Sequence, residues 1–318
     1  MSAARLFWRA PTYKGPERRH QPRRRIRPLR ALIALLTIVV AGYALGALSL
    51  MVRETRLIFE AVQSLGDARP PFAFQQIDLP RGDGLRQFAW LMRPPATGQA
   101  AWALYLHGSP STIASPVNIA HYALLRSLGL HVMAPEYRGF GGLQGTPSEA
   151  ALLADARAAY DYLRERERVP ADRVVLYGWS LGGAVAVDLA TRVETAAVIL
   201  EGAPASMADL HQQRYPLFPV RLLMRNPLQA VEKIGRSRAP VLILHSPADA
   251  VVPIADAHRL QAAAAAAPAR LVEIDGGHVD AIEVDAARMA ETIRAFLAEH
   301  GLELERAAAQ PNVSSARN

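Results

Sequence analysis

The stretch that decides the fold is Gly178-Trp179-Ser180-Leu181-Gly182-Gly183, which reads G-x-S-x-G over its first five residues. An apolar, β-branched run over residues 173–177 precedes it, and a run of small residues over 184–190 follows it. Strand, sharp turn and helix in that order are the context that a nucleophile elbow requires. We therefore expect Ser180 at a tight turn, with its hydroxyl pushed away from the backbone and a helix N-terminus beside it.

On both sides of this stretch, apolar strands alternate with helical segments. The alternation predicts an α/β fold, in which a mostly parallel sheet carries helices on both faces. The first two strands are short, are separated by the turn Asp83-Gly84, and are expected to form an antiparallel edge. The expected strands cover residues 72–79, 85–92, 102–106, 131–135, 173–177, 196–200, 240–244 and 270–274, and the expected helices cover 57–65, 119–128, 147–166, 184–190 and 285–299.

A serine hydroxyl is a weak nucleophile, so it needs a neighbouring base and a third group that orients the base. On this type of fold the partners follow in the order serine, acid, histidine. Asp249 follows the strand 240–244, and His278 follows the strand 270–274. Because the carboxyl ends of parallel strands meet at one edge, we expect both side chains near Ser180. The predicted catalytic residues are therefore Ser180, Asp249 and His278.

Each partner has a competitor in the sequence. Glu201 follows another expected strand and is the rival acid. Asp249 could also be an ordinary turn residue, because a proline two positions before an aspartate is typical of turns. We favour Asp249 because of its order and its place at a strand end. After Asp249, His258 lies on an expected helix and His300 lies near the tail, which leaves His278 as the base.

The oxyanion of an acyl-transfer intermediate needs two N–H donors. The N–H of Leu181, directly after the nucleophile, is the expected first donor. The second is expected from the loop after the strand 102–106, where Pro110 has no N–H to give. We expect the backbone N–H of Ser109 to be this second donor, and the N–H of Gly108 is the alternative.

The chain has no cysteine. This excludes a thiol nucleophile, thiolate zinc sites and disulfides. We expect neither a cofactor nor a metal at the site. His107 is interpreted as a residue that shapes the oxyanion loop, and His245 as a structural residue at a strand end.

The positive charge is concentrated at the amino end. The formal net charge is +7, yet residues 1–30 hold ten Lys and Arg against the single acid Glu17, a net of +9 that leaves about −2 for residues 31–318. The basic residues are therefore concentrated in an amino-terminal arm, residues 1–30, and not in the rest of the chain, which we call the body. No basic stripe with interleaved aromatics follows, so nucleic acid is excluded as a partner.

The arm precedes a segment that is long enough to span a bilayer. Residues 31–52 are 22 positions without a charge, with five arginines close before them. By the positive-inside rule, residues 1–30 stay in the cytoplasm and the body is exported, to the periplasmic side in a bacterium. We favour an uncleaved signal anchor; the alternative is a cleaved signal peptide, for which the small residues at 44–49 are suited.

The remaining chain divides by composition. We expect a linker, a single α/β domain with a short cap, and a disordered polar tail. The cap is apolar, as an acyl-binding lid would be, and as an ordinary helix packed on the sheet would also be. The expected boundaries are 53–71 for the linker, 72–300 for the domain, 203–238 for the cap within it and 301–318 for the tail.

From about residue 72 to 300 the chain resembles the α/β-hydrolase superfamily. It is similar in particular to membrane-anchored abhydrolase-domain serine hydrolases, whose members include lysophospholipases, acylglycerol lipases, protein depalmitoylases and serine aminopeptidases. Ser246 and Val279 depart from the residues expected of the family. The matching stretches are His107-Gly108, Tyr137-Arg138-Gly139-Phe140-Gly141-Gly142, Gly145-Thr146-Pro147-Ser148-Glu149, the G-x-S-x-G stretch, Tyr215-Pro216-Leu217-Phe218-Pro219-Val220-Arg221 and Gly276-Gly277-His278.

These observations predict a serine hydrolase that cleaves an acyl ester through a Ser-Asp-His triad and an acyl-enzyme intermediate. The membrane segment and the apolar cap indicate a lipid or lipid-like ester as the substrate. Two alternatives stay open. One is an exported serine peptidase or aminopeptidase, and the other is a membrane-anchored, non-catalytic binding protein on the same scaffold.

Overall fold

The computed structural model describes residues 15, 28–80, 84–94 and 101–304. Most of the basic arm, part of the turn at 83–84 and the tail after residue 304 lie outside these residues. Within the described residues, eight strands form one sheet in the order β1-β2-β4-β3-β5-β6-β7-β8. The strands are β1 (Gln75–Leu79), β2 (Gln87–Met92), β3 (Trp102–Leu106), β4 (His131–Pro135), β5 (Val174–Trp179), β6 (Ala197–Glu201), β7 (Val241–His245) and β8 (Ala269–Glu273).

The pairing of the strands confirms the expected α/β fold. Strands β3 to β8 pair in parallel, whereas β2 is antiparallel to both of its neighbours, β1 and β4. The six residues of β5, Val174–Trp179, are all buried, as in a parallel strand that is covered on both faces. The strand that leads to Ser180 is therefore held rigidly in the middle of the sheet.

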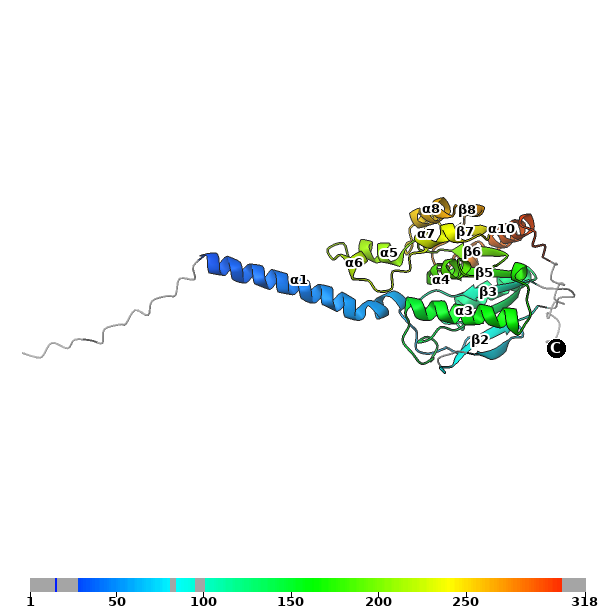
Figure 1. The fold of residues 1–318 in the computed structure, drawn as a ribbon, viewed down its shortest axis with the longest axis horizontal. Helices are drawn as coiled ribbons and strands as arrows, with labels where there is room; N and C mark the ends of the chain where they lie inside the picture. The colour runs from blue at the N-terminus through cyan, green and yellow to red at the C-terminus, as the bar shows by residue number, and fades with distance from the viewer. Residues whose placement is uncertain (1–14, 16–27, 81–83, 95–100, 305–318) are drawn as a thin grey trace, which may run out of the picture. The chain divides into compact units, whose positions relative to one another are not determined.

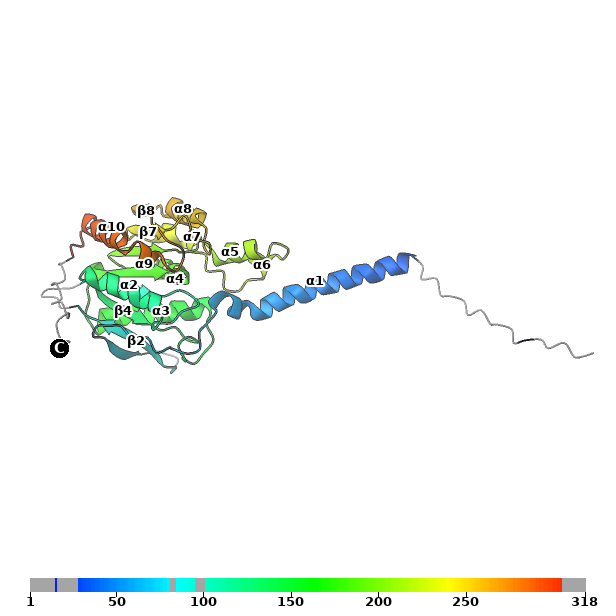
Figure 2. The same cartoon turned by 180° about the vertical axis from the view of Figure 1, so that it is seen from behind.

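Helices cover both faces of the sheet (Figures 1 and 2). Helices α3, α4, α7 and α8 pack on one face, and α2, α9 and α10 pack on the other. Each face thus has its own hydrophobic core. The bounds are α2 (Pro116–Ser127), α3 (Glu149–Glu165), α4 (Leu181–Ala190), α7 (Ala230–Lys233), α8 (Ile254–Ala263), α9 (Ala281–Val284) and α10 (Ala286–Glu299), with 3₁₀ turns η1 (Ala171–Arg173) and η2 (Ile234–Arg236).

The expected cap region lies between β6 and β7. It contains two short helices, α5 (Met207–Arg214) and α6 (Val220–Leu223), before α7 returns the chain to the sheet. The hydroxyl of Ser206 caps α5 by accepting the N–H of Asp209 at 3.1 Å. Both of these helices are short.

Helix α1 (Pro28–Phe59) differs from the prediction. The sequence predicts a separate helix over 57–65 inside a linker, but α1 runs without a break to Phe59 and stops at Glu60, whose φ of +42° is incompatible with a right-handed helix. The following segment has no regular structure. It is tied to the body because Val62 O accepts the N–H of Gly141 at 2.8 Å and Leu65 O accepts the hydroxyl of Thr112 at 2.8 Å.

The chain divides into two compact units, residues 1–46 and residues 47–318. In the described part of the first unit, α1 is exposed and apolar. Among the described residues, α1 is the one helix long and apolar enough to cross a membrane, with a mean hydropathy of 2.4 in its most apolar window and none of that window buried. The second unit holds the last turns of α1, and these bury Ile58 and Phe59 in its core.

Candidate active site

Ser180 occupies the sharp turn between β5 and α4. Its backbone has φ +52° and ψ −123°, a conformation that is rare for any residue other than glycine. Its N–H donates to Glu201 O at 2.8 Å, which ties the turn to the end of β6. The glycines explain how so tight a turn fits. A Cβ on Gly178 would lie 2.5 Å from Gly182 O, and one on Gly182 would lie 2.0 Å from Leu106 O.

The structure brings the three predicted catalytic side chains together. Nε2 of His278 lies 2.8 Å from Oγ of Ser180, and Nδ1 of His278 lies 2.7 Å from Oδ2 of Asp249. A carboxylate only accepts, so Nδ1 carries the proton, and the lone pair of Nε2 faces the serine hydroxyl. This is the tautomer that can take a proton from Ser180.

Asp249 is held as a carboxylate. Burial raises the pKa of its carboxyl, but the hydrogen bond from His278 and the backbone N–H groups of Val252 and Val251 lower it more, so the pKa lies below its ordinary value. Both N–H groups donate to Oδ1 at 2.8 Å, which leaves Oδ2 for the histidine. Asp249 is thus charged and fixed in orientation at neutral pH.

The rival acid, Glu201, is occupied elsewhere. Its Oε2 lies 2.8 Å from Nε2 of His121 and accepts the hydroxyl of Tyr177. All three side chains are buried beneath the elbow. The Glu201 carboxylate is therefore engaged by His121 and Tyr177, and it is the backbone carbonyl of Glu201 that accepts the N–H of Ser180.

The loop after β3 lies directly against the nucleophile. A Cβ on Gly108 would come within 2.8 Å of the Cβ of Ser180, so only a glycine allows this approach. The next residue is Ser109, the expected second oxyanion donor, and Leu181 begins α4 on the other side of Ser180. The arrangement is compatible with N–H donors from either Ser109 or Gly108.

A buried pair of side chains that the sequence does not predict supports this loop. Nε2 of His107 lies 2.9 Å from Oε1 of Glu136, and the other carboxylate oxygen accepts the N–H of Ile113 at 3.1 Å. Nδ1 of His107 lies 2.9 Å from Gly108 O. The available signal was that His107 and Glu136 follow two neighbouring parallel strands, β3 and β4. His107 thus contacts the loop at Gly108.

Ser246, one of the departures from the family pattern, joins two loops of the candidate site. Its hydroxyl donates to Gly276 O, and it accepts the N–H of Ala248 at 3.1 Å. The loop that carries Asp249 is therefore tied to the loop that carries His278. In the described ranges, no group of three or more His, Cys, Asp or Glu side chains is arranged to hold a metal ion.

Comparisons with known proteins agree with this architecture. A model of the alpha/beta hydrolase family matches residues 103–230. The Mycobacterium tuberculosis protein Rv2307c is 34% identical over 273 residues, which cover 84% of this chain and 94% of that protein. The chain belongs to the alpha/beta-hydrolase superfamily. The superfamily places its serine at a G-x-S-x-G elbow, the position that Ser180 occupies here.

Two proteins that are themselves named hydrolases are also similar to this chain. Lysophosphatidylserine lipase ABHD12 of Danio rerio is 32% identical over 168 residues, which cover 47% of this chain and 44% of that protein. The Pyrococcus furiosus esterase Pf2001 superposes with a TM-score of 0.64 at 17% identity, covering 76% of this chain and 98% of that chain. The second likeness is one of fold.

The lowered pKa of Asp249 predicts a pH-dependent contribution to stability. A carboxyl whose pKa is lower in the folded state stabilises the fold above its unfolded pKa and loses that contribution as the pH falls through the folded pKa. The free energy of unfolding of the wild type, minus that of Asp249→Asn, should therefore shrink as the pH falls below about 4. Urea unfolding at a series of pH values, followed by tryptophan fluorescence, measures this difference. A difference that stays constant or grows toward acid pH would contradict the assignment.

Proposed function

We propose that this protein is a membrane-anchored serine hydrolase that cleaves acyl esters through Ser180, His278 and Asp249. The observation that carries the proposal is the continuous hydrogen-bonded line from Asp249 through His278 to Ser180, with distances of 2.7 and 2.8 Å. These distances are within hydrogen-bond reach, which a nucleophile and its base require.

The chemistry follows from the arrangement of these groups. Ser180 Oγ attacks the acyl carbonyl while Nε2 of His278 takes its proton, and the charged Asp249 stabilises the imidazolium that forms. The N–H groups of Leu181 and Ser109 hold the oxyanion. His278 then returns the proton to the leaving alcohol, and a water molecule, activated by the same histidine, releases the acid from the acyl-enzyme.

An ester, and a lipid-like one, is the substrate class that the similarities favour. One relative is named a lysophosphatidylserine lipase, and a structural neighbour is an esterase. The apolar helix α1 would keep the catalytic unit at a bilayer surface. We propose that residues 31–52 are an uncleaved anchor, with residues 1–30 in the cytoplasm and the catalytic unit on the exported side.

The serine mechanism predicts a large loss of activity in one variant. The full-length protein in detergent micelles should hydrolyse p-nitrophenyl esters, and Ser180→Ala should lower kcat/KM by at least about ten-thousand-fold because the nucleophile is gone. Ser127→Ala, which removes an exposed serine at the end of α2, is the matched control and should retain the wild-type rate. Ester hydrolysis that survives in Ser180→Ala would contradict the mechanism. A folded wild type without activity on any ester would favour the peptidase or the binding protein.

The orientation predicts the behaviour of a reporter. Alkaline phosphatase fused to the carboxyl end should be active in a bacterial host, because it folds only where its disulfides form, outside the cytoplasm. The fusion should stay in the membrane fraction with its amino end intact. Replacing the five arginines at 23–25, 27 and 30 by glutamine should reduce the exported fraction. An inactive wild-type fusion contradicts the orientation, and a mature chain that begins near residue 50 contradicts the uncleaved anchor.

A further inference from the structure

The outer side of the cap carries two leucines that are open to solvent. Leu222 on α6 is 86% exposed, and Leu217 in the loop before α6 is 81% exposed. Among the described residues no other large apolar side chain is as exposed as these two, those of α1 included. Two such side chains in one short segment are typical of an interaction surface. We call this segment, residues 214–225, the cap tip.

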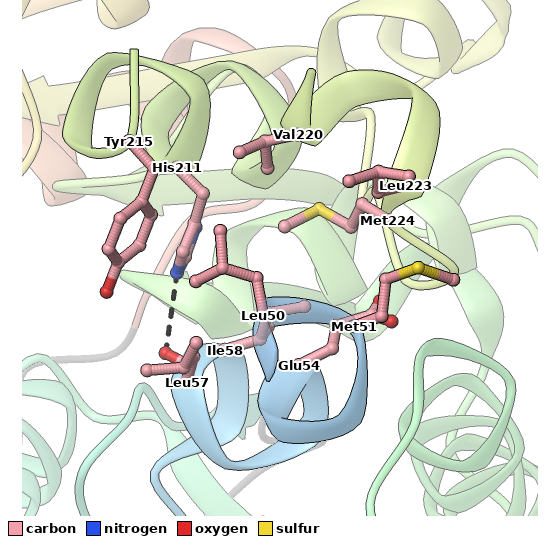
Figure 3. Close-up of a pocket in the computed structure, with 10 residues that line it drawn as sticks. All are labelled: Leu50, Met51, Glu54, Leu57, Ile58, His211, Tyr215, Val220, Leu223 and Met224. Carbon is pink, nitrogen blue, oxygen red and sulfur yellow. Dashed lines mark hydrogen bonds between the residues drawn. The ribbon is translucent and has the colours of Figure 1, made fainter. Parts of the chain in front are cut away.

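The inner side of the cap tip packs against the last turns of α1. The contact lies within the compact unit of residues 47–318, so it belongs to one body. The side chains from the two helices face each other across a narrow apolar groove (Figure 3). They are Val220, Leu223 and Met224 from the cap tip and Leu50 and Met51 from α1.

Hydrogen bonds fix the level at which the cap tip meets α1. The carboxylate of Glu54, which is only 5% exposed, accepts the backbone N–H groups of Arg225 and Asn226, both at 2.7 Å. The guanidinium of Arg225 also donates to Met51 O at 3.3 Å. Because the buried carboxylate is shielded from water, these bonds hold the cap tip at one position along the helix.

That level coincides with the end of the segment expected to cross the membrane. The uncharged run 31–52 has 22 residues. At about 1.5 Å per residue it is about 33 Å long, which only just spans a hydrocarbon core of about 30 Å. Its last turn therefore lies at the boundary between acyl chains and head groups. Leu50 and Met51 belong to that turn, so the cap tip beside them lies at the same boundary.

The charge of the surrounding segment suits this boundary. Residues 210–231 contain no Asp or Glu and three arginines. The side chains of Arg221 and Arg225 are 60% and 67% exposed, although each has an acidic partner, Asp209 at 2.6 Å and Glu54 at 3.0 Å. A guanidinium has five N–H donors, so those left over can bind lipid phosphate. Apolar side chains flanked by arginines are typical of a segment that lies in the membrane interface.

We propose that the cap tip is a second membrane contact, in which Leu217 and Leu222 enter the interface of the bilayer that α1 crosses, while the arginines of the cap tip bind lipid phosphates. The proposal goes beyond the assignment of Ser180 and rests on the proposed function only for α1 as the anchor. With two contacts, the catalytic unit has a fixed orientation on the membrane. The cap follows β6, whose end accepts the N–H of Ser180, so a docked cap turns that edge of the sheet toward the bilayer.

The test uses the absence of cysteine, which lets a single thiol be placed in the full-length chain. Leu222→Cys, labelled with the fluorophore NBD, is reconstituted into vesicles of phosphatidylcholine and phosphatidylglycerol. Its emission should shift to the blue, and most of its intensity should be lost when the lipids carry a nitroxide near the head of the acyl chain. Ser127→Cys is the matched control and should change little. Ser127 is exposed at the end of α2, which runs back from β3 to the start of the parallel strand β4, away from the cap.

A second measurement separates the native side chain from the label. With the label on Leu217→Cys, the added substitution Leu222→Glu should restore most of the fluorescence in nitroxide vesicles, because a carboxylate opposes insertion and is repelled by lipid phosphates. The conservative Leu222→Met keeps the apolar surface and should leave the quenching in place. Equal quenching with leucine and with glutamate at position 222 would overturn the docking role of this side chain.

The other outcomes separate the docking surface from the anchor. A label at position 222 that stays in water, in a chain that floats with the vesicles, overturns the docking while the anchor and the serine mechanism stand. A blue shift without quenching by nitroxide also overturns it, because protein, such as a second copy of the chain, then covers the label. Equal quenching of the Ser127→Cys control overturns it as well. A chain that does not float with the vesicles overturns the anchor and the docking together, whereas ester hydrolysis still reports separately on Ser180.

Discussion

The strained backbone of Ser180 is the feature on which the rest of the site depends. A left-handed φ of +52° at a serine persists only where the surroundings enforce it. Here α4 packs so closely on β3 that a Cβ on Gly182 would lie 2.0 Å from Leu106 O, and the Ser180 N–H is bound to the end of β6. The turn is therefore held in place by contacts with β3 and β6, the two strands that flank β5. Its hydroxyl points away from the backbone, toward His278.

The other groups reach Ser180 because the parallel strands end at one edge. Asp249 and His278 follow β7 and β8, which pair side by side, and Ser246 ties the two loops together. The loop expected to supply an oxyanion donor follows β3 on the opposite side of β5, where the buried pair of His107 and Glu136 supports it. Short-range hydrogen bonds at the ends of rigid strands thus set distances among residues that lie up to 98 positions apart in the chain.

The sequence predicts the sheet, the elbow and the three side chains that meet there, because strand ends and chain order determine which residues share an edge. It does not predict the pairing of Glu54 with Arg225 and Asn226, which are more than 170 residues away. Between Arg53 and Arg56, Glu54 has the pattern of a charged membrane flank, so residues 53–71 were expected to be a linker. Tertiary packing instead extends α1 to Phe59 and holds its last turns against residues 225 and 226. The sequence also leaves the role of the Glu201 carboxylate open. Its partner His121 lies on α2, far from Glu201 in the sequence, so only the folded structure shows the pairing.

The most direct test of the account is covalent labelling by a fluorophosphonate probe, which reacts with a serine only when a base and an oxyanion hole activate it. The account predicts that the folded full-length protein takes up one probe, that peptide mass spectrometry locates the probe on Ser180, and that heat-denatured protein and Ser180→Ala remain unlabelled. A folded sample that does not react, or that carries the probe on another residue, would contradict the claim that Ser180 is an activated nucleophile.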